Sequence, residues 1–278
     1  MQPQDVIAII GAGGIGEAVA RRQGAGRTIL LADCNANVLE AAATRLEEAG
    51  HRVETQAVDT TARASVEALA ARAAALGPVV HMVNTAGVSP NMASARRVLE
   101  VDLYGTALVF EVFEGVIAPG GAGLIVSSMA GHMIRQLPLE QEQALAFTPA
   151  DALLALPFLG PEAVPDSMTA YCMAKRANAL RVRAAALSWG ARGARVNAIS
   201  PGIVVTPLAR HELASPIGDG YRAMIAASPA GRMAPPDEIA LACAFLLGPD
   251  AGFVTGTDLL IDGGVIAAMF AGKIQLPG

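Results

Sequence analysis

Two residues four positions apart, Tyr171 and Lys175, have side chains that can move a proton together. They lie near the start of a stretch, Met168–Trp189, that predicts a long helix, so both side chains share one helix face. On an arbitrary helix such a pair would simply be solvated. Beside a redox cofactor, however, a phenol whose pKa of about 10 is lowered by a neighbouring ammonium can act as a general acid and base.

Three glycines, Gly11, Gly13 and Gly16, form a Gly-x-Gly-x-x-Gly turn between a predicted strand, Val6–Ile10, and a predicted helix, Ile15–Gln23. In this context backbone amides and the helix N-terminus can approach a pyrophosphate. A glycine-rich turn that binds nothing is the alternative, but the strand–turn–helix setting favours a dinucleotide. The expected cofactor contacts of the turn are Gly11, Gly13, Gly14, Ile15 and Gly16.

A carboxylate, Asp33, follows the second predicted strand, seventeen residues after Gly16. There it can accept hydrogen bonds from the adenosine ribose hydroxyls of NAD, and it would repel a 2′-phosphate. Neither Arg nor Lys follows at positions 34–36, so NADP lacks its usual partner. We expect NAD rather than NADP, and its positive nicotinamide would lower the pKa of Tyr171 further. The alternative is that Asp33 merely caps the next helix.

Short apolar runs typical of buried strands alternate with helical patterns along the chain. This alternation predicts an α/β, Rossmann-type doubly wound parallel sheet of about seven strands, with helices on both faces in three α/β/α layers. No shift in composition marks a second domain, so we expect one domain over residues 1–278. The predicted strands are Val6–Ile10, Thr28–Ala32, Val53–Val58, Val79–Asn84, Gly123–Ser127, Arg195–Ile199 and Asp258–Ile261, and the predicted helices are Ile15–Gln23, Ala36–Ala49, Ala62–Leu76, roughly Arg97–Ala118, Met168–Trp189, pieces between Pro207 and Ala227, and Pro236–Leu247.

Two segments break this rhythm. Residues 132–168 are proline-rich and lack a strand signal, so they predict an insertion that either forms a lid lining a bulky apolar pocket or packs over the surface. Within it, the run from Thr148 to Asp151 predicts a short helix through Leu156. The apolar tail, residues 265–278, is expected to close the active site of its own chain or of a neighbour.

The composition excludes several classes of partner. A net charge of −5 gives no reason to expect nucleic acid or an anionic membrane surface, and no stretch approaches the length of a membrane-spanning helix. The three cysteines are scattered and the four histidines show no ligand spacing, so we expect neither a disulfide framework nor a metal site. These features favour a reducing, cytoplasmic location.

Taken together, the motifs closely resemble the short-chain dehydrogenase/reductase family through nearly the whole chain. Four of its motifs occur in order: the turn from Gly11 to Gly16, Asn84 to Gly87, the serine-ending strand Ile125–Ser128, and Tyr171 to Lys175. The resemblance implies that Ser128 hydrogen-bonds the substrate oxygen, that Tyr171 exchanges its proton, and that Lys175 binds the nicotinamide ribose. The further cofactor contacts expected at strand ends or by resemblance are Asp33, Asp59, Asn84, Ala86, Gly87, Tyr171, Lys175, Pro201, Gly202, Val204 and Thr206, the last for the carboxamide.

The sequence departs from the family at three points. The glycine turn is one residue shorter than usual, and forty-three residues separate Ser128 from Tyr171 where about thirteen are common. Asp102 replaces the asparagine that completes the family's catalytic tetrad by helping to hold a water connected to the lysine. Its carboxylate could pair with Lys175, partly cancel the effect of Lys175 on Tyr171, or leave the water bound by the backbone alone. We expect activity with an altered pH profile.

The resemblance implies an NAD(P)-dependent oxidoreductase acting on CH–OH groups. Its substrate would be a secondary alcohol or ketone, apolar and fairly bulky, with the hydride moving to or from NAD. The alternatives are a catalytically impaired dinucleotide-binding protein of the same fold and, less favoured by the chain's ending, a lyase or epimerase. The family's long helices also predict a homotetramer, although the insertion emerges beside one of them and leaves a dimer open.

Overall fold

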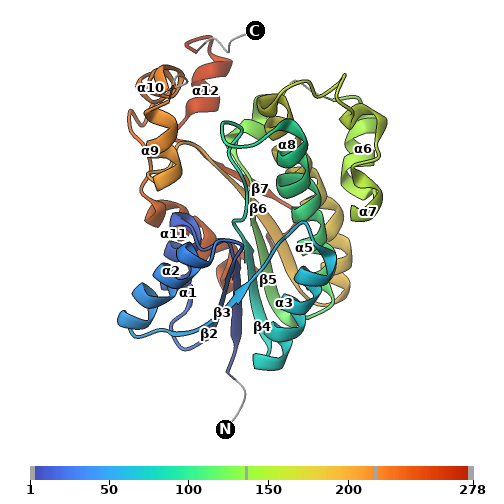
Figure 1. Ribbon diagram of the computed structural model, residues 1–278, viewed down its shortest axis with the longest axis vertical. Coiled ribbons are helices and arrows are strands. Elements are labelled where there is room, and N and C mark those ends of the chain that lie inside the picture. The colour runs from blue at the N-terminus through green and yellow to red at the C-terminus, as the bar shows by residue number, and fades with distance from the viewer. Residues whose placement is uncertain (1–3, 135–136, 216–217, 275–278) are drawn as a thin grey trace.

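The computed structural model describes residues 4–134, 137–215 and 218–274. Seven parallel strands form one sheet in the order β3-β2-β1-β4-β5-β6-β7, so the predicted doubly wound α/β fold is confirmed (Figure 1). The strand order reverses between β1 and β4, and a crevice at the carboxyl ends of the strands is where ligands bind in such sheets. The strands are β1 (Val6–Ile10), β2 (Thr28–Asp33), β3 (Arg52–Ala57), β4 (Val79–Asn84), β5 (Ile117–Val126), β6 (Arg195–Pro201) and β7 (Asp258–Ile261).

Strand β1 shows why the sheet is covered on both faces. All five of its side chains are fully buried, with Val6, Ala8 and Ile10 in one apolar cluster and Ile7 and Ile9 in the other. This alternation follows from the two-residue period of a strand. Helices α3 (Arg63–Leu76), α5 (Thr106–Glu114) and α8 (Ser167–Ala191) cover the first face, and α1 (Gly14–Gln23), α2 (Ala36–Glu48) and α11 (Pro236–Leu247) cover the second (Figure 1).

The helix predicted over residues 97–118 is present, but its predicted end is wrong. Helix α4 (Ala95–Val98) leads into a π-helical segment, η1 (Leu99–Gly105), and α5 ends at Glu114. Strand β5 already begins at Ile117, where it pairs with Val79, and its register shifts before Ala122. The apolar residues 116–118 therefore belong to a turn and an irregular strand start, which a pattern of apolar residues alone does not distinguish from the end of a helix.

The insertion packs on the outer side of α8. Its elements are α6 (Leu139–Phe147), α7 (Ala150–Leu153) and η3 (Pro157–Leu159), and Leu145, Leu153 and Leu159 are buried in a cluster that includes α8 (Figure 1). Arg181 of α8 donates hydrogen bonds to the carbonyls of Leu145 at 3.0 Å and Thr148 at 2.8 Å. Of the two alternatives for this segment, surface packing describes these helices.

The short helix predicted through Leu156 ends earlier, at Leu153. Tighter turns follow it, because the amides of Ala155 and Leu156 each bond to the carbonyl three residues earlier and Pro157 cannot continue a helix. The cap also differs, since the amide of Ala150 donates to a carboxylate oxygen of Glu111 at 2.7 Å rather than to the predicted cap residue, Thr148.

Three short helices and a 3₁₀ turn gather beyond the carboxyl ends of the strands: α9 (Pro207–Leu213), α10 (Gly218–Ala227), α12 (Val265–Phe270) and η2 (Met129–His132). The tail helix α12 packs against α10 through Ile266 and Met269, which lie in a cluster with Tyr221 and Met224. The last four residues of the predicted tail, 275–278, lie outside the described residues.

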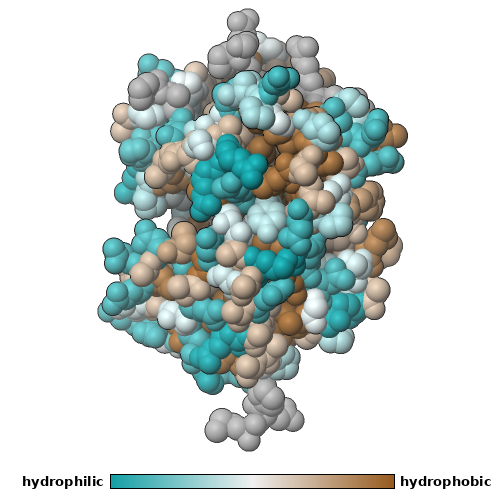
Figure 2. Space-filling model, turned by 45° about the vertical axis from the view of Figure 1, so that its right-hand side comes forward, coloured by the Kyte–Doolittle hydropathy of each residue, from teal (hydrophilic) through white to brown (hydrophobic). Residues whose placement is uncertain are grey.

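In the view of Figure 2, hydrophilic and hydrophobic residues are interspersed over the surface, and neither kind covers the whole face. Within the described ranges, no helix is both long and apolar enough to cross a membrane. The same residues contain no group of three or more His, Cys, Asp or Glu side chains placed to hold a metal ion.

Candidate active site

A cavity of about 570 Å³ opens at the carboxyl ends of the central strands, between the β4 and β5 loops, the start of α8, and helices α9 and α10. Its walls are mostly apolar. The apolar lining includes Ile15, Val88, Met129, Ile134, Met168, Ile203, Leu208 and Met224, and the polar lining includes Ser89, Asp102, Ser128, Tyr171, Lys175 and Glu212. A volume of this size is typical of sites for small organic molecules.

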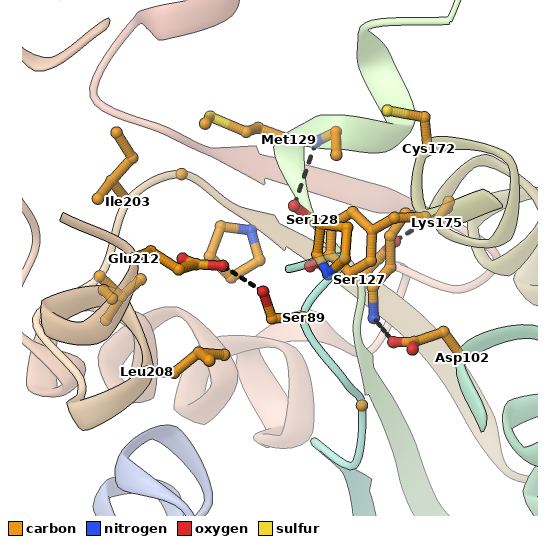
Figure 3. A pocket seen from close by; sticks show the side chains of 18 of the residues that line it. Ser89, Asp102, Ser127, Ser128, Met129, Cys172, Lys175, Ile203, Leu208 and Glu212 are labelled. Atoms are coloured by element: carbon orange, nitrogen blue, oxygen red, sulfur yellow. Dashed lines mark hydrogen bonds and ion pairs between the residues drawn. The ribbon is translucent and has the colours of Figure 1, made fainter. Parts of the chain in front are cut away.

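The structure brings Ser128, Tyr171 and Lys175 together in this cavity, and Figure 3 shows Ser128 and Lys175 there. Asp166 caps the first turn of α8 by accepting a hydrogen bond from the amide of Thr169 at 2.8 Å, and the helix then carries Tyr171 and Lys175 inward. The Lys175 ammonium lies 5.1 Å from the centre of the Tyr171 ring. The four-residue spacing thus places both side chains in one cavity.

The two serines at the end of β5 have different roles. The buried Ser127 hydroxyl donates to the main-chain carbonyl of Lys175 at 2.9 Å, which fixes the strand end to α8. The half-buried Ser128 hydroxyl accepts a bond from the amide of Ala130 at 3.2 Å, and its own proton is directed to Tyr171, whose pKa this hydrogen bond lowers. Ser128 is therefore the serine suited to contact a substrate oxygen.

Asp102 forms an ion pair with Lys175 inside the protein, with 2.7 Å between Oδ1 and Nζ (Figure 3). The carboxylate is fully buried, and its Oδ2 accepts a hydrogen bond from the amide of Val88 at 3.1 Å. Of the alternatives for this residue, pairing with the lysine is observed, and Asp102 also partly cancels the effect of Lys175 on the pKa of Tyr171. Gly87 permits the approach, because a Cβ there would lie 2.6 Å from Asp102 Oδ1.

The pKa of Tyr171 differs from the value that the sequence predicts. Burial raises the pKa of Tyr171, Lys175 lowers it, and Asp102 raises it again, so the pKa lies above the ordinary value of a phenol. The predicted lowering is wrong for the protein groups acting alone, because desolvation and Asp102 outweigh the ammonium. Burial lowers the pKa of Lys175, but Asp102 opposes this so effectively that the pKa is raised overall.

The glycine turn lies beside the cavity and has the geometry of a phosphate cradle. Gly11 has a φ of +99°, and a Cβ on Gly16 would lie 1.9 Å from the carbonyl oxygen of Gly11. A Cβ on Gly13, by contrast, would meet open space. The turn therefore requires glycine for its own packing at two positions and leaves the N-terminus of α1 open to an anion, which fits a dinucleotide.

Comparison with known proteins agrees with this geometry. Residues 5–137 match the family described as short chain dehydrogenase, and residues 137–266 match the family described as enoyl-(acyl carrier protein) reductase. The chain is 41% identical over 265 residues to the short-chain dehydrogenase/reductase bsc3 of Alternaria brassicicola, covering 95% of this chain and 96% of that protein. The chain belongs to the short-chain dehydrogenase/reductase family. It is thus an oxidoreductase of a family whose dehydrogenases act on alcohols.

Two further dehydrogenases illustrate the similarity. The D-threitol dehydrogenase of Mycolicibacterium smegmatis is 35% identical over 265 residues, covering 91% of this chain and 89% of that protein. Among solved structures, a 7α-hydroxysteroid dehydrogenase complexed with NADH and 7-oxo glycochenodeoxycholic acid superposes with a TM-score of 0.75 at 25% identity, covering 94% of this chain and 93% of that one.

Within this short-chain dehydrogenase, Asp33 lies next to the glycine turn. Its Oδ2 accepts a hydrogen bond from the amide of Ala12 and its Oδ1 from the amide of Asn35, both at 2.8 Å. Asn35, not Asp33, caps α2, since its side chain accepts bonds from the amides of Asn37 and Val38. The alternative that Asp33 is only a helix cap is therefore wrong.

Some of the remaining predicted cofactor residues make local hydrogen bonds, and several of the others line the cavity. Asp59 and Asn84 are engaged in local turns: Asp59 accepts from the amide of Thr61 at 2.8 Å, and buried Asn84 accepts from the amide of Ala86 at 3.1 Å. Thr206 caps α9 through the amide of Ala209 and lies against Gly14 of the glycine turn. The predicted residues that line the cavity are Ile15, Gly87, Asp102, Ser128, Tyr171, Lys175, Pro201, Gly202, Val204 and Thr206.

Sequence reasoning missed several polar residues of the cavity, among them Ser89, Glu212 and Tyr221. Ser89 and Glu212 come from the β4 loop and α9 and are joined by a hydrogen bond of 2.5 Å. No motif contains them, and 123 residues separate them in the chain, so only the fold shows that they meet.

Proposed function

We propose that this protein is an NAD-dependent dehydrogenase that interconverts a secondary alcohol, apolar and fairly bulky, and its ketone. The observation that supports it best is the meeting of Ser128, Tyr171 and Lys175 in a largely apolar cavity beside the glycine turn. A phenol, a hydroxyl and a buried ammonium are the groups that hydride transfer to a carbonyl needs for its proton and its developing negative charge.

In the proposed mechanism, NAD would be held by the glycine turn, Asp33 and Thr206, and supplies the hydride acceptor when bound. Ser128 donates a hydrogen bond to the substrate oxygen and fixes its position. Tyr171 takes the hydroxyl proton as the alcohol is oxidised, and returns it in the reverse direction. Lys175 stabilises the phenolate, and Asp102 holds the ammonium in place while weakening its electrostatic effect on Tyr171.

The preference for NAD over NADP is supported by Asp33 and its surroundings. The carboxylate lies beside the glycine turn, and the next three residues, Cys34, Asn35 and Ala36, carry no positive charge to meet a 2′-phosphate. The similar 7α-hydroxysteroid dehydrogenase complexed with NADH is consistent with this choice.

We further propose a homo-oligomer. A tetramer is the expectation carried by the family, and the packing of α6 on the outer side of α8 makes a dimer a second candidate. The catalytically impaired alternative is not proposed, because all three chemical groups are present in one cavity.

The proposed function predicts that Tyr171→Phe abolishes turnover and leaves NAD binding intact. We would titrate the purified protein calorimetrically with NAD and NADP, and then follow nicotinamide reduction over a panel of secondary alcohols. Tyr104→Phe is the matched control, since this phenol contacts Asp151 of the insertion at 3.4 Å and does not line the cavity. Tight NAD binding without turnover on any alcohol or ketone, or full activity of Tyr171→Phe, would contradict the proposal.

A further inference from the structure

A buried carboxylate, Glu212, lies in the cavity and has no part in the proposed hydride transfer. It projects from α9 and is only 8% exposed. Figure 3 shows Glu212 and Ser89 on one side of the cavity and Lys175 and Asp102 on the other. A carboxylate removed from water is costly unless hydrogen bonds or an ion compensate it, so its position in an apolar wall calls for a partner.

The protein holds one carboxylate oxygen firmly. The Ser89 hydroxyl donates to Glu212 Oε1 at 2.5 Å, and the Asn91 side-chain amide donates to the same oxygen at 3.5 Å. The Ser89 hydroxyl in turn accepts a bond from the amide of Asn91 at 3.2 Å, so its proton is directed to Glu212. Among the described residues, both of these bonds go to Oε1, the other polar side chain beside the carboxylate is the phenol of Tyr221, and no Lys, Arg or His lies in salt-bridge contact with it.

A second polar group, Tyr221 of α10, lines the cavity beside this carboxylate. Burial raises the pKa of Tyr221, and Glu212 raises it further through its charge and through a hydrogen bond from the phenol, so the phenol keeps its proton. Glu212 can only accept a hydrogen bond, whereas Tyr221 can donate one. A ligand hydroxyl that enters between them can donate to Glu212 and accept from Tyr221, whereas an ammonium can only donate.

We propose that Glu212, with Ser89 and Tyr221, binds a second hydroxyl group of the substrate. The substrate is then a diol or hydroxyketone with an apolar body, whose reacting oxygen meets Ser128 and Tyr171 and whose other hydroxyl meets Glu212. A substrate carrying a carboxylate at that end is rejected by charge repulsion. This inference rests on the proposed function and names the substrate class of the same site.

The test compares matched pairs of diol and mono-ol built on cyclohexane, decalin and steroid frames, which span a range of distances between the two oxygens. Because a hydrogen bond to a charged group is worth about 10- to 100-fold in affinity, kcat/KM for the best diol should exceed that of its mono-ol by such a factor. The isosteric Glu212→Gln variant should lower this ratio about tenfold, since the charge-assisted bond becomes a neutral one. Leu208→Ala, which enlarges the same wall, should change both members alike.

Thermal unfolding of each variant checks that it is folded, and separate kcat and KM values show where the change lies. A ratio near one on every frame, or an equal loss for diol and mono-ol in Glu212→Gln, would overturn the inference and leave Glu212 as a link between α9 and the β4 loop. Turnover of mono-ols that depends on Tyr171 would still uphold the proposed function in that case. Absence of turnover on every frame would instead refute the proposed function, and this inference with it.

Discussion

Replacing Asp102 by asparagine is the perturbation that bears most directly on the chemistry. The change keeps the shape of the side chain and removes a fully buried negative charge 2.7 Å from the Lys175 ammonium. Asp102 is one of the groups that raise the pKa of Tyr171, after burial, so its loss should lower that pKa. The phenolate that accepts the alcohol proton then forms at lower pH.

The magnitude follows from two distances. Lys175 lies 5.1 Å from the Tyr171 ring centre and 2.7 Å from Asp102, which keeps the carboxylate within about 8 Å of the ring. At an effective dielectric constant of about 20, charges about 8 Å apart repel by about 2 kcal/mol. We therefore expect the limb of the pH–rate profile that reports Tyr171 to move by about 1.5 pH units toward acid in Asp102→Asn.

The assay is alcohol oxidation at saturating NAD over a broad pH range, with kcat and kcat/KM analysed separately. Asp151→Asn, at a carboxylate on the insertion that pairs with Arg63, serves as the control and should leave the profile unchanged. An unchanged profile in Asp102→Asn would refute the electrostatic reasoning. A shift toward alkaline pH would refute it too, because it would mean that Lys175 loses its proton without its partner.

Two further predictions concern the turn and the insertion. Gly16→Ala should weaken NAD binding more than a hundredfold and lower the melting temperature, because the new Cβ would lie 1.9 Å from the Gly11 carbonyl oxygen. In the control Gly13→Ala the new Cβ meets no atom, so this variant should fold normally. Calorimetric titration and thermal unfolding compare the two variants. Arg181→Met should destabilise the protein by about 1.5–3 kcal/mol in urea unfolding by leaving two carbonyls of the insertion without their donor, and it should leave kcat nearly unchanged. Equal NAD affinity in the two glycine variants, or unaltered stability in Arg181→Met, would contradict these expectations.

The local sequence pattern was sufficient to predict an element where that element is one clear apolar run or one helical period. Strands β1 and β7 and helix α11 occupy the predicted residues, and the glycine turn, Ser128 and the Tyr171–Lys175 pair meet at the predicted edge of the sheet. The boundary between α5 and β5 was wrong, because residues 116–118 are apolar in either structure and the deciding contact is the long-range pairing of Ile117 with Val79.

Electrostatic environment was the part that sequence could not supply. The sign of the pKa shift of Tyr171 depends on how deeply α8 is buried and on where η1 places Asp102, and both are properties of packing. The Ser89–Glu212 contact joins segments that share no motif. Such residues become visible only when the fold has brought the loops together.

The insertion also affects the loop-closure entropy of the chain, because it lengthens the connection between Ser128 and Tyr171. Closing a loop of forty-three residues rather than about thirteen between Ser128 and Tyr171 costs only about 1 kcal/mol more, since the cost grows with the logarithm of length. Burial of each of three leucines of the insertion stabilises the folded protein by about 1.5–3 kcal/mol of transfer free energy. These leucines are Leu145, Leu153 and Leu159. A segment of this kind can therefore lengthen or shorten over evolutionary time while Ser128 and Tyr171 stay adjacent, provided that its apolar side chains keep contact with α8.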